Sequence, residues 1–219
     1  SAIVQKQKGA LYGDVVVKLL TDAKASREEV LRGFDWLQQQ VTPKDVGIVL
    51  IAGHGINDER GNYFYLPFDA DTDRLEATGV PFNLVKRYLA NLRGKGLLFV
   101  DTCHSGNVMG KRRGLSNDTT AMLNELASPE YGLVVIASST GKQYSFESAE
   151  WGNGAFTKAL VEGLGGRADL KKRGRITHKM LDFYVSDRVD ELTHGQQTPV
   201  NTSPMGVPDY TIATVAAPG

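Results

Sequence analysis

The single cysteine of the chain, Cys103, and one of its four histidines, His54, have the chemistry of a nucleophile and its base. His54 lies in the sequence AGHG and Cys103 in the sequence DTCHSG, and each motif directly follows an apolar run. An imidazole beside a thiol stabilises the thiolate, the reactive form, near neutral pH. We therefore predict that Cys103 is a nucleophile and that His54 is its acid or base.

Glycines lie close to both reactive residues, and we expect them to let a substrate backbone approach closely. Taken singly, a cysteine at a strand end is usually a small buried hydrophobe, and a lone histidine is more often structural than catalytic. The occurrence of both in similar contexts favours catalysis. His104 is a poorer candidate for the base, because adjacent residues of an extended chain point to opposite sides.

Asp101 lies two residues before Cys103, so an extended backbone places both on one face. A buried carboxylate beside a nucleophile is unfavourable unless a cation pairs with it. A substrate Arg or Lys side chain would provide that cation, as in a trypsin-type pocket. Asp101 therefore predicts cleavage after basic residues; the alternative is that it caps a neighbouring turn.

Continuous apolar runs predict the strands that would position these residues. Residues 46–52 and 97–101 are typical of central parallel strands, covered on both faces, that lead into the two motifs. Because neighbouring strands lie about 4.8 Å apart, His54 and Cys103 can lie within reach at the carboxyl ends of such strands. Further strands are predicted at residues 15–20, 63–67 (an edge strand), 133–137 and 209–214, the last closing the sheet.

Helical patterns alternate with these strands. Ser26 and Glu29 have the spacing of a capping box before an amphipathic helix that ends near Pro43. The other predicted helices span residues 83–92, 120–126, 155–164 and 177–192. This alternation predicts one α/β domain over residues 1–219, a three-layer α/β/α sandwich around a mostly parallel sheet.

The ordered set of motifs resembles the caspase and metacaspase group, especially its bacterial metacaspase-like or orthocaspase members. His54 and Cys103 are 49 residues apart, against about 50 in the caspase pattern. The resemblance extends over the sequences IASS, GAFT and QTPV, which begin at Ile136, Gly154 and Gln197.

The resemblance implies a cysteine endopeptidase that forms an acyl-enzyme thioester on Cys103. The backbone amides of Gly55 and Cys103 would form the oxyanion hole. Metacaspases carry Asp at the position of Asp101, where animal caspases have Gln, which again favours cleavage after Arg or Lys. Ser138 and Ser139, at the end of the next strand, are candidates for lining the peptide groove.

Lys111, Arg112 and Arg113 lie in a glycine- and asparagine-containing loop, residues 106–118, between the two halves that this family often separates by cleavage. A peptidase that prefers basic residues would process itself there. The alternative is a solvated basic loop.

The chain departs from the family at its start, because only 14 residues precede the segment 15–20. The first strand and helix of caspase-like domains have no counterpart among them. We expect an open sheet edge, which an N-terminal segment or a partner chain would complete.

Asp69, Asp71 and Asp73 resemble the start of a calcium loop, but Arg74 and Val80 occupy the required glycine and glutamate positions. The sequence thus requires no metal or other cofactor, although the family resemblance leaves calcium activation open.

Composition restricts the remaining functional classes. The 25 basic and 25 acidic residues balance, which argues against nucleic-acid binding, and no apolar run is long enough to span a membrane. One cysteine and no secretory leader are typical of a cytoplasmic protein acting on peptide or protein substrates. The main rival is a catalytically inactive caspase-like binding module, against which the presence of both His54 and Cys103 argues.

Overall fold

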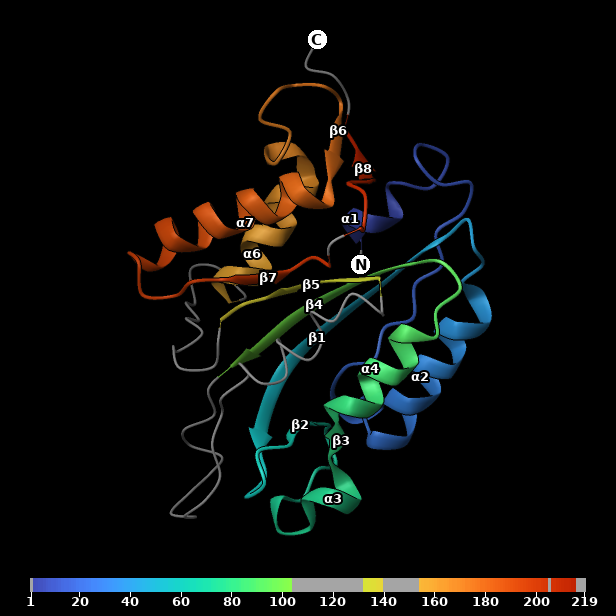
Figure 1. Ribbon diagram of the computed structural model, residues 1–219, viewed down its shortest axis with the longest axis vertical. Helices are drawn as coiled ribbons and strands as arrows, with labels where there is room; N and C mark the ends of the chain where they lie inside the picture. Colours follow the sequence, from blue (N-terminus) through green and yellow to red (C-terminus); the bar gives the residue numbers. More distant parts are fainter. Residues whose placement is uncertain (1, 104–131, 140–153, 205, 216–219) are drawn as a thin grey trace. The chain divides into compact units, whose positions relative to one another are not determined.

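The computed structural model describes residues 2–103, 132–139, 154–204 and 206–215, and Figure 1 shows their arrangement. The chain forms two compact units. One comprises residues 20–145 and 200–207, and the other comprises residues 1–19, 146–199 and 208–219. Each unit is described separately below.

The first unit is built on a six-stranded sheet with the strand order β3-β2-β1-β4-β5-β7. Its strands are β1 (Val46–Asn57), β2 (Tyr63–Leu66), β3 (Val80–Pro81), β4 (Lys95–Cys103), β5 (Leu133–Ala137) and β7 (Val200–Thr202). β1, β4 and β5 run parallel, and the other pairings are antiparallel. The predicted sheet with a parallel core is confirmed. β2 is not the edge strand that we expected, because β3 pairs with its outer side.

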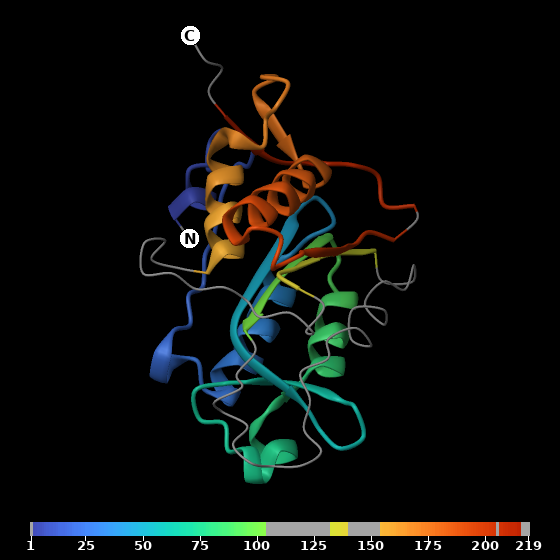
Figure 2. The same ribbon diagram turned by 90° about the vertical axis from the view of Figure 1, so that its left-hand side faces the viewer.

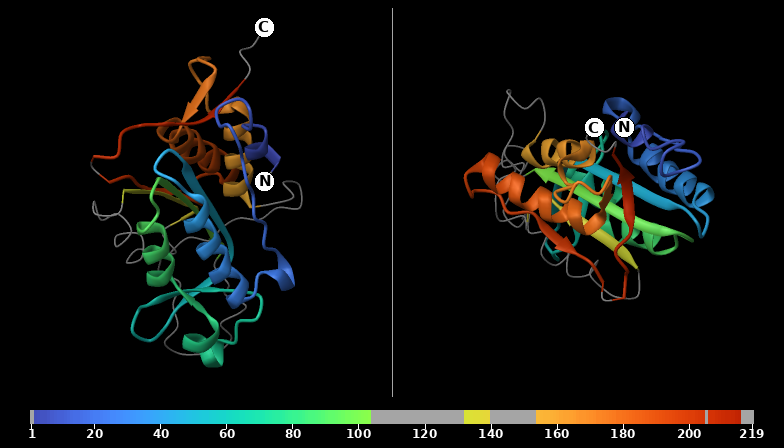
Figure 3. Two further views of the ribbon diagram at one scale, coloured as in Figure 1. Left: turned by 90° about the vertical axis from the view of Figure 1, so that its right-hand side faces the viewer. Right: turned by 90° about the horizontal axis from the view of Figure 1, so that it is seen from above.

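Two helices cover one face of this sheet: α2 (Arg27–Gln40) and α4 (Phe82–Ala90). They lie side by side against the strands in Figures 1 and 3. Apolar side chains of both helices and of the strands form the core between them, among them Phe34, Ile51, Val85, Leu89, Leu98 and Val135. The Ser26 hydroxyl caps α2 by accepting a hydrogen bond from the Glu29 amide at 3.4 Å. The Glu29 carboxylate binds Arg32 at 2.9 Å.

Short elements complete this unit: η1 (Asp22–Lys24), η2 (Thr72–Arg74) and α3 (Leu75–Thr78). Figure 2, turned by 90°, shows α3 beside the β2–β3 end of the sheet. Leu75 packs there with Ile56 and Phe64 in a second, smaller apolar cluster.

The second unit contains α1 (Ala2–Gln5), α6 (Ala155–Glu162), a π turn at Gly163–Arg167, β6 (Arg175–Thr177), α7 (His178–Thr193) and β8 (Thr211–Thr214). Its α6 and α7 pack against each other, and β6 pairs antiparallel with β8. The expectation that residues 209–214 close the main sheet is therefore wrong. That position is taken by β7, which pairs antiparallel with β5.

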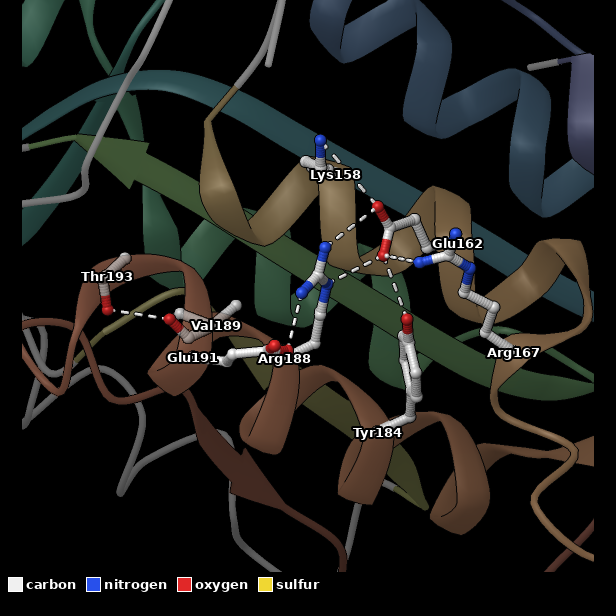
Figure 4. Close-up of polar contacts among 8 residues, drawn as sticks. All are labelled: Lys158, Glu162, Arg167, Tyr184, Arg188, Val189, Glu191 and Thr193. Carbon is white, nitrogen blue, oxygen red and sulfur yellow. Dashed lines mark hydrogen bonds and ion pairs between the residues drawn. The ribbon is translucent and has the colours of Figure 1, made fainter. Parts of the chain in front are cut away.

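A charged cluster joins α6 to α7 (Figure 4). The Glu162 carboxylate accepts hydrogen bonds from Arg188 Nε at 2.9 Å, Tyr184 Oη at 3.0 Å and Arg167 Nη1 at 3.1 Å. Lys158 Nζ lies 3.9 Å from the same carboxylate, one helical turn earlier in α6. We call these five residues the Glu162 cluster.

The predicted strand at residues 15–20 is wrong. These residues have no regular secondary structure, and Val16 and Leu19 are exposed. β-Branched residues favour an extended backbone, but a strand forms only when a neighbour satisfies its amides and carbonyls. In the part of the chain that the structure describes, no strand pairs with this segment.

β1 has an open edge along much of its length. Within the described ranges, residues 46–53 pair only with β4, and β2 begins to pair at His54. We expected β1 to be covered on both faces. Leu50 is instead 51% exposed, so this half of β1 is covered on one face only. A segment or partner chain that completes this edge stays a prediction.

Candidate active site

The two predicted reactive residues meet at the carboxyl ends of β1 and β4. In the parallel register of these strands, His54 is the direct partner of Cys103 and Ala52 is the partner of Asp101. Paired residues of a parallel ladder lie on the same face of the sheet, and adjacent strands are about 4.8 Å apart. The side chain of His54 is exposed on this face. The fold thus places a solvent-accessible imidazole beside the backbone position of Cys103.

Asp101 lies on the same face as positions 54 and 103, because residues two apart in a strand share a face. Its side chain is buried, with 6% of its surface exposed. The buried carboxyl group is two residue pairs further into the sheet than His54 and Cys103. This arrangement places a buried carboxyl group on the same face as His54, further into the sheet.

The glycines around His54 leave room for aromatic side chains of β2. A Cβ atom at Gly53 would lie 3.2 Å from the Tyr65 ring, and one at Gly55 would overlap the ring and hydroxyl of Tyr63. Gly53 also has a φ of 149°, a conformation that other residues rarely adopt. Both glycines thus accommodate tyrosines of β2 on the face opposite His54.

Sequence reasoning missed a buried hydrogen bond behind the site. The Tyr63 hydroxyl donates to Thr102 Oγ1 at 2.8 Å, and both side chains are buried. Thr102 directly precedes Cys103 and is the register partner of Gly53. The sequence signal for this contact was the spacing of Tyr63 and Tyr65, two residues apart in a predicted strand, because this spacing places both rings on one face of the sheet.

Of the other predicted site residues, the structure describes Ser138, Ser139 and Gly55. Ser138 and Ser139 are buried directly after β5, and the Ser138 amide donates to Val100 O at 2.8 Å. Gly55, predicted for the oxyanion hole, lies in β1 opposite Tyr65 of β2. The predicted processing residues Lys111, Arg112 and Arg113, the loop 106–118, the predicted helix 120–126 and His104 lie outside the described residues.

The acidic loop after β2 uses its carboxylates to bind backbone amides, one at the start of α2 and one within the loop. Asp69 Oδ1 accepts from the Arg27 amide at 2.7 Å, and Asp71 Oδ1 accepts from the Asp73 amide at 2.9 Å. Among the described residues, no group of three or more His, Cys, Asp or Glu side chains is arranged to hold a metal ion.

Comparison with known families identifies the domain. A family model of the caspase domain, a peptidase family, matches residues 12–208. The chain belongs to the caspase domain family. The match covers the sheet and positions 54, 101 and 103, and it supports a caspase-family cysteine peptidase.

The fold of this caspase domain is similar to that of a solved structure. The crystal structure of protein GSU0716 from Geobacter sulfurreducens has a TM-score of 0.63 and 14% sequence identity, and the match covers 98% of this chain and 86% of that one. At this identity the similarity concerns the fold alone. None of the curated proteins compared with the chain matches it. Among the described helices, none has the length and apolar character needed to cross a bilayer.

Proposed function

We propose that this caspase domain is a cysteine endopeptidase that cleaves peptide bonds after Arg or Lys with Cys103 as nucleophile and His54 as acid and base. The observation that supports this proposal is the register of β1 and β4, in which His54 and Cys103 are direct partners at the carboxyl ends of two parallel strands. Active sites of open α/β sheets form at such strand ends.

The reaction follows from the two side chains. The Cys103 thiolate adds to the scissile carbonyl carbon, and the carbonyl oxygen becomes an oxyanion, which the amides of Gly55 and Cys103 would stabilise. The C–N bond then breaks, and protonated His54 donates its proton to the leaving amine. A thioester remains on Cys103. Neutral His54 next removes a proton from water, which attacks the thioester, and the C–S bond breaks to release the carboxylic acid and regenerate the thiol.

Primary specificity is proposed to come from Asp101. Its buried carboxylate lies on the same face as His54 and position 103, where it would attract a guanidinium or ammonium group of the substrate. Ser138 and Ser139 follow the neighbouring strand β5 and would line the peptide groove beside it. The loop with Lys111, Arg112 and Arg113 would then be a substrate of the same activity, as in the metacaspase and orthocaspase types.

The decisive test is turnover of fluorogenic peptides that end in Arg, Lys or Asp, by wild type, Cys103→Ala and Asp101→Asn, with and without calcium. We expect cleavage after Arg and Lys that Cys103→Ala abolishes and Asp101→Asn lowers by about 10-fold or more. Cleavage only after Asp would overturn the role of Asp101. No cleavage by wild type under any condition would favour a catalytically inactive binding module.

Self-processing is tested separately with Arg112→Ala/Arg113→Ala. We expect this variant to remain one chain under conditions in which wild type yields two fragments and Cys103→Ala yields none. Identical fragments from wild type and the double variant would rule the site out.

A further inference from the structure

The back of the active site contains a tyrosine that reaches across three strands. Tyr63 belongs to β2 and is the register partner of Asn57 of β1. Its ring passes against Gly55, where a side chain of any other residue would overlap it. Its hydroxyl then reaches β4 and donates to Thr102 Oγ1 at 2.8 Å. Tyr63 thus touches the residue after His54 and binds the residue before Cys103.

The position of this tyrosine is closely constrained. Tyr63 is 6% exposed and Thr102 is 7% exposed, so water does not compete freely for their hydrogen bond. The Phe82 ring of α4 packs edge-on against the Tyr63 ring, with 5.7 Å between the centroids. A fixed ring that contacts one strand and is hydrogen-bonded to the next holds the two strand ends at a set separation.

We propose that Tyr63 and Thr102 are positioning residues that set the alignment of His54 with Cys103 from the opposite face of the sheet. This inference rests on the proposed Cys–His activity. A small change in the separation of two reacting groups has a large effect on rate, because catalysis needs them aligned within a fraction of an ångström. Neither residue contacts substrate, since both lie on the face opposite His54.

Three variants test the pair. Tyr63→Phe and Thr102→Val each remove one hydroxyl with little change of shape, and the double variant removes both. We expect each single variant to lower kcat by about 10-fold or more while KM changes by less than about threefold. The double variant should be no slower than the single ones, because each single variant already breaks the Tyr63–Thr102 bond. Thr102→Ser keeps the hydroxyl and should restore most of the rate.

Stability separates positioning from a merely structural role. Each single variant breaks the Tyr63–Thr102 bond and keeps one of its two hydroxyls buried, so its urea midpoint should fall; removal of both hydroxyls should recover part of that loss. We expect kcat of the double variant to stay low although its midpoint recovers. Recovery of kcat together with the midpoint would overturn the inference.

Tyr65 provides a matched control. It lies two residues further along β2, on the same face, with its ring against Gly53. Among the described residues its hydroxyl has no hydrogen-bond partner. Tyr65→Phe should therefore leave kcat within about twofold of wild type. A loss as large as that of Tyr63→Phe would show that any hydroxyl on this face matters, and would overturn the specific role of the Tyr63–Thr102 bond.

A second measurement does not depend on peptidase turnover. Cys103 is the one cysteine of the chain, so the rate of alkylation by iodoacetamide reports on its thiol alone. If His54 stabilises the thiolate, the wild-type alkylation rate stays high well below pH 8.5, the pKa of a free thiol. Tyr63→Phe should shift this pH profile toward that of His54→Ala.

The alkylation profiles distinguish failure of the inference from failure of the proposed function. A wild-type profile that differs from His54→Ala but is unchanged in Tyr63→Phe and Thr102→Val would overturn the positioning role and leave the dyad in place. Identical profiles for wild type and His54→Ala would mean that no dyad forms. That result would overturn the proposed function and the inference with it.

Discussion

Two regions of this caspase domain join neighbouring elements through polar side chains, and they do so by opposite means. At the ends of β1 and β4 a single hydrogen bond between neutral hydroxyls, Tyr63 to Thr102, is buried among aromatic rings. Between α6 and α7 the Glu162 cluster uses an ionised carboxylate with several cationic partners at a half-buried surface.

The physical consequences differ accordingly. Burial acts to raise the pKa of Glu162, but hydrogen bonds from Arg188 and Tyr184 and the nearby positive charges outweigh it and lower that pKa below its usual value. Hydrogen bonds with Glu162 and Glu191 raise the pKa of Arg188. A charged cluster with many partners tolerates the loss of one of them and is weakened by salt. A neutral buried bond depends on shape, so salt and pH leave it unchanged while a single methyl group disrupts it.

The largest effect should come from a methyl group behind the active site. Gly55→Ala places a Cβ where the Tyr63 hydroxyl and ring now lie, so the ring must move away from Thr102. We expect unfolding free energy to fall by about 2–3 kcal/mol, with a loss of peptidase activity. Gly13→Ala is the control, since a Cβ there meets nothing within 4 Å. Equal urea midpoints for the two variants would contradict the steric account.

An intermediate effect is expected in the Glu162 cluster. Arg188→Met keeps much of the apolar stem but removes the closest cationic partner of Glu162, and should lower stability by about 1–2 kcal/mol at low salt. Arg32→Met is the matched control, because Arg32 pairs with Glu28 and Glu29 while 62% exposed. Its loss should be below about 0.5 kcal/mol.

Salt sharpens the contrast between the two regions. In about 1 M NaCl, where the Debye length is about 3 Å, the difference between wild type and Arg188→Met should shrink. The loss caused by Tyr63→Phe should stay the same. A salt-independent Arg188→Met effect, measured by urea unfolding, would show that packing of the arginine stem matters more than charge.

The smallest effect concerns pH and His178, the first residue of α7. Burial lowers its pKa, against the opposing effects of a hydrogen bond with Pro208 O and of the Asp209 carboxylate, 3.4 Å away. The folded state therefore binds a proton less readily than the unfolded chain, whose histidine has a pKa of 6.5. This contribution to stability is fully present above pH 6.5 and is lost as the pH falls below it.

His178→Phe removes the titrating group and keeps a ring against Tyr210. Between pH 7 and pH 5, wild type should lose more stability than this variant, measured by urea unfolding at each pH. Parallel pH profiles would mean that folded and unfolded His178 bind protons alike. Tyr63→Phe should leave the slope of the wild-type profile unchanged, because the strand-end bond carries no charge.

Local sequence patterns predicted much of this fold. The apolar runs at residues 46–52, 97–101 and 133–137 correspond to β1, β4 and β5, and the Ser26 signal corresponds to the start of α2. These signals work because burial on both faces and helix capping depend on residues close together in the chain. The same reasoning failed for residues 15–20 and 209–214, whose strand propensity does not specify which strand, if any, pairs with them.

By itself the sequence determined the reactive residue types, Cys103 and His54, and their location after apolar strands. Only the tertiary structure decided that these two residues are register partners, that the glycines beside His54 accommodate tyrosines, and that Tyr63 reaches Thr102. The physical reason is distance along the chain. Strand registry and a hydrogen bond between residues 39 positions apart arise from packing of the whole sheet, and no local pattern encodes them.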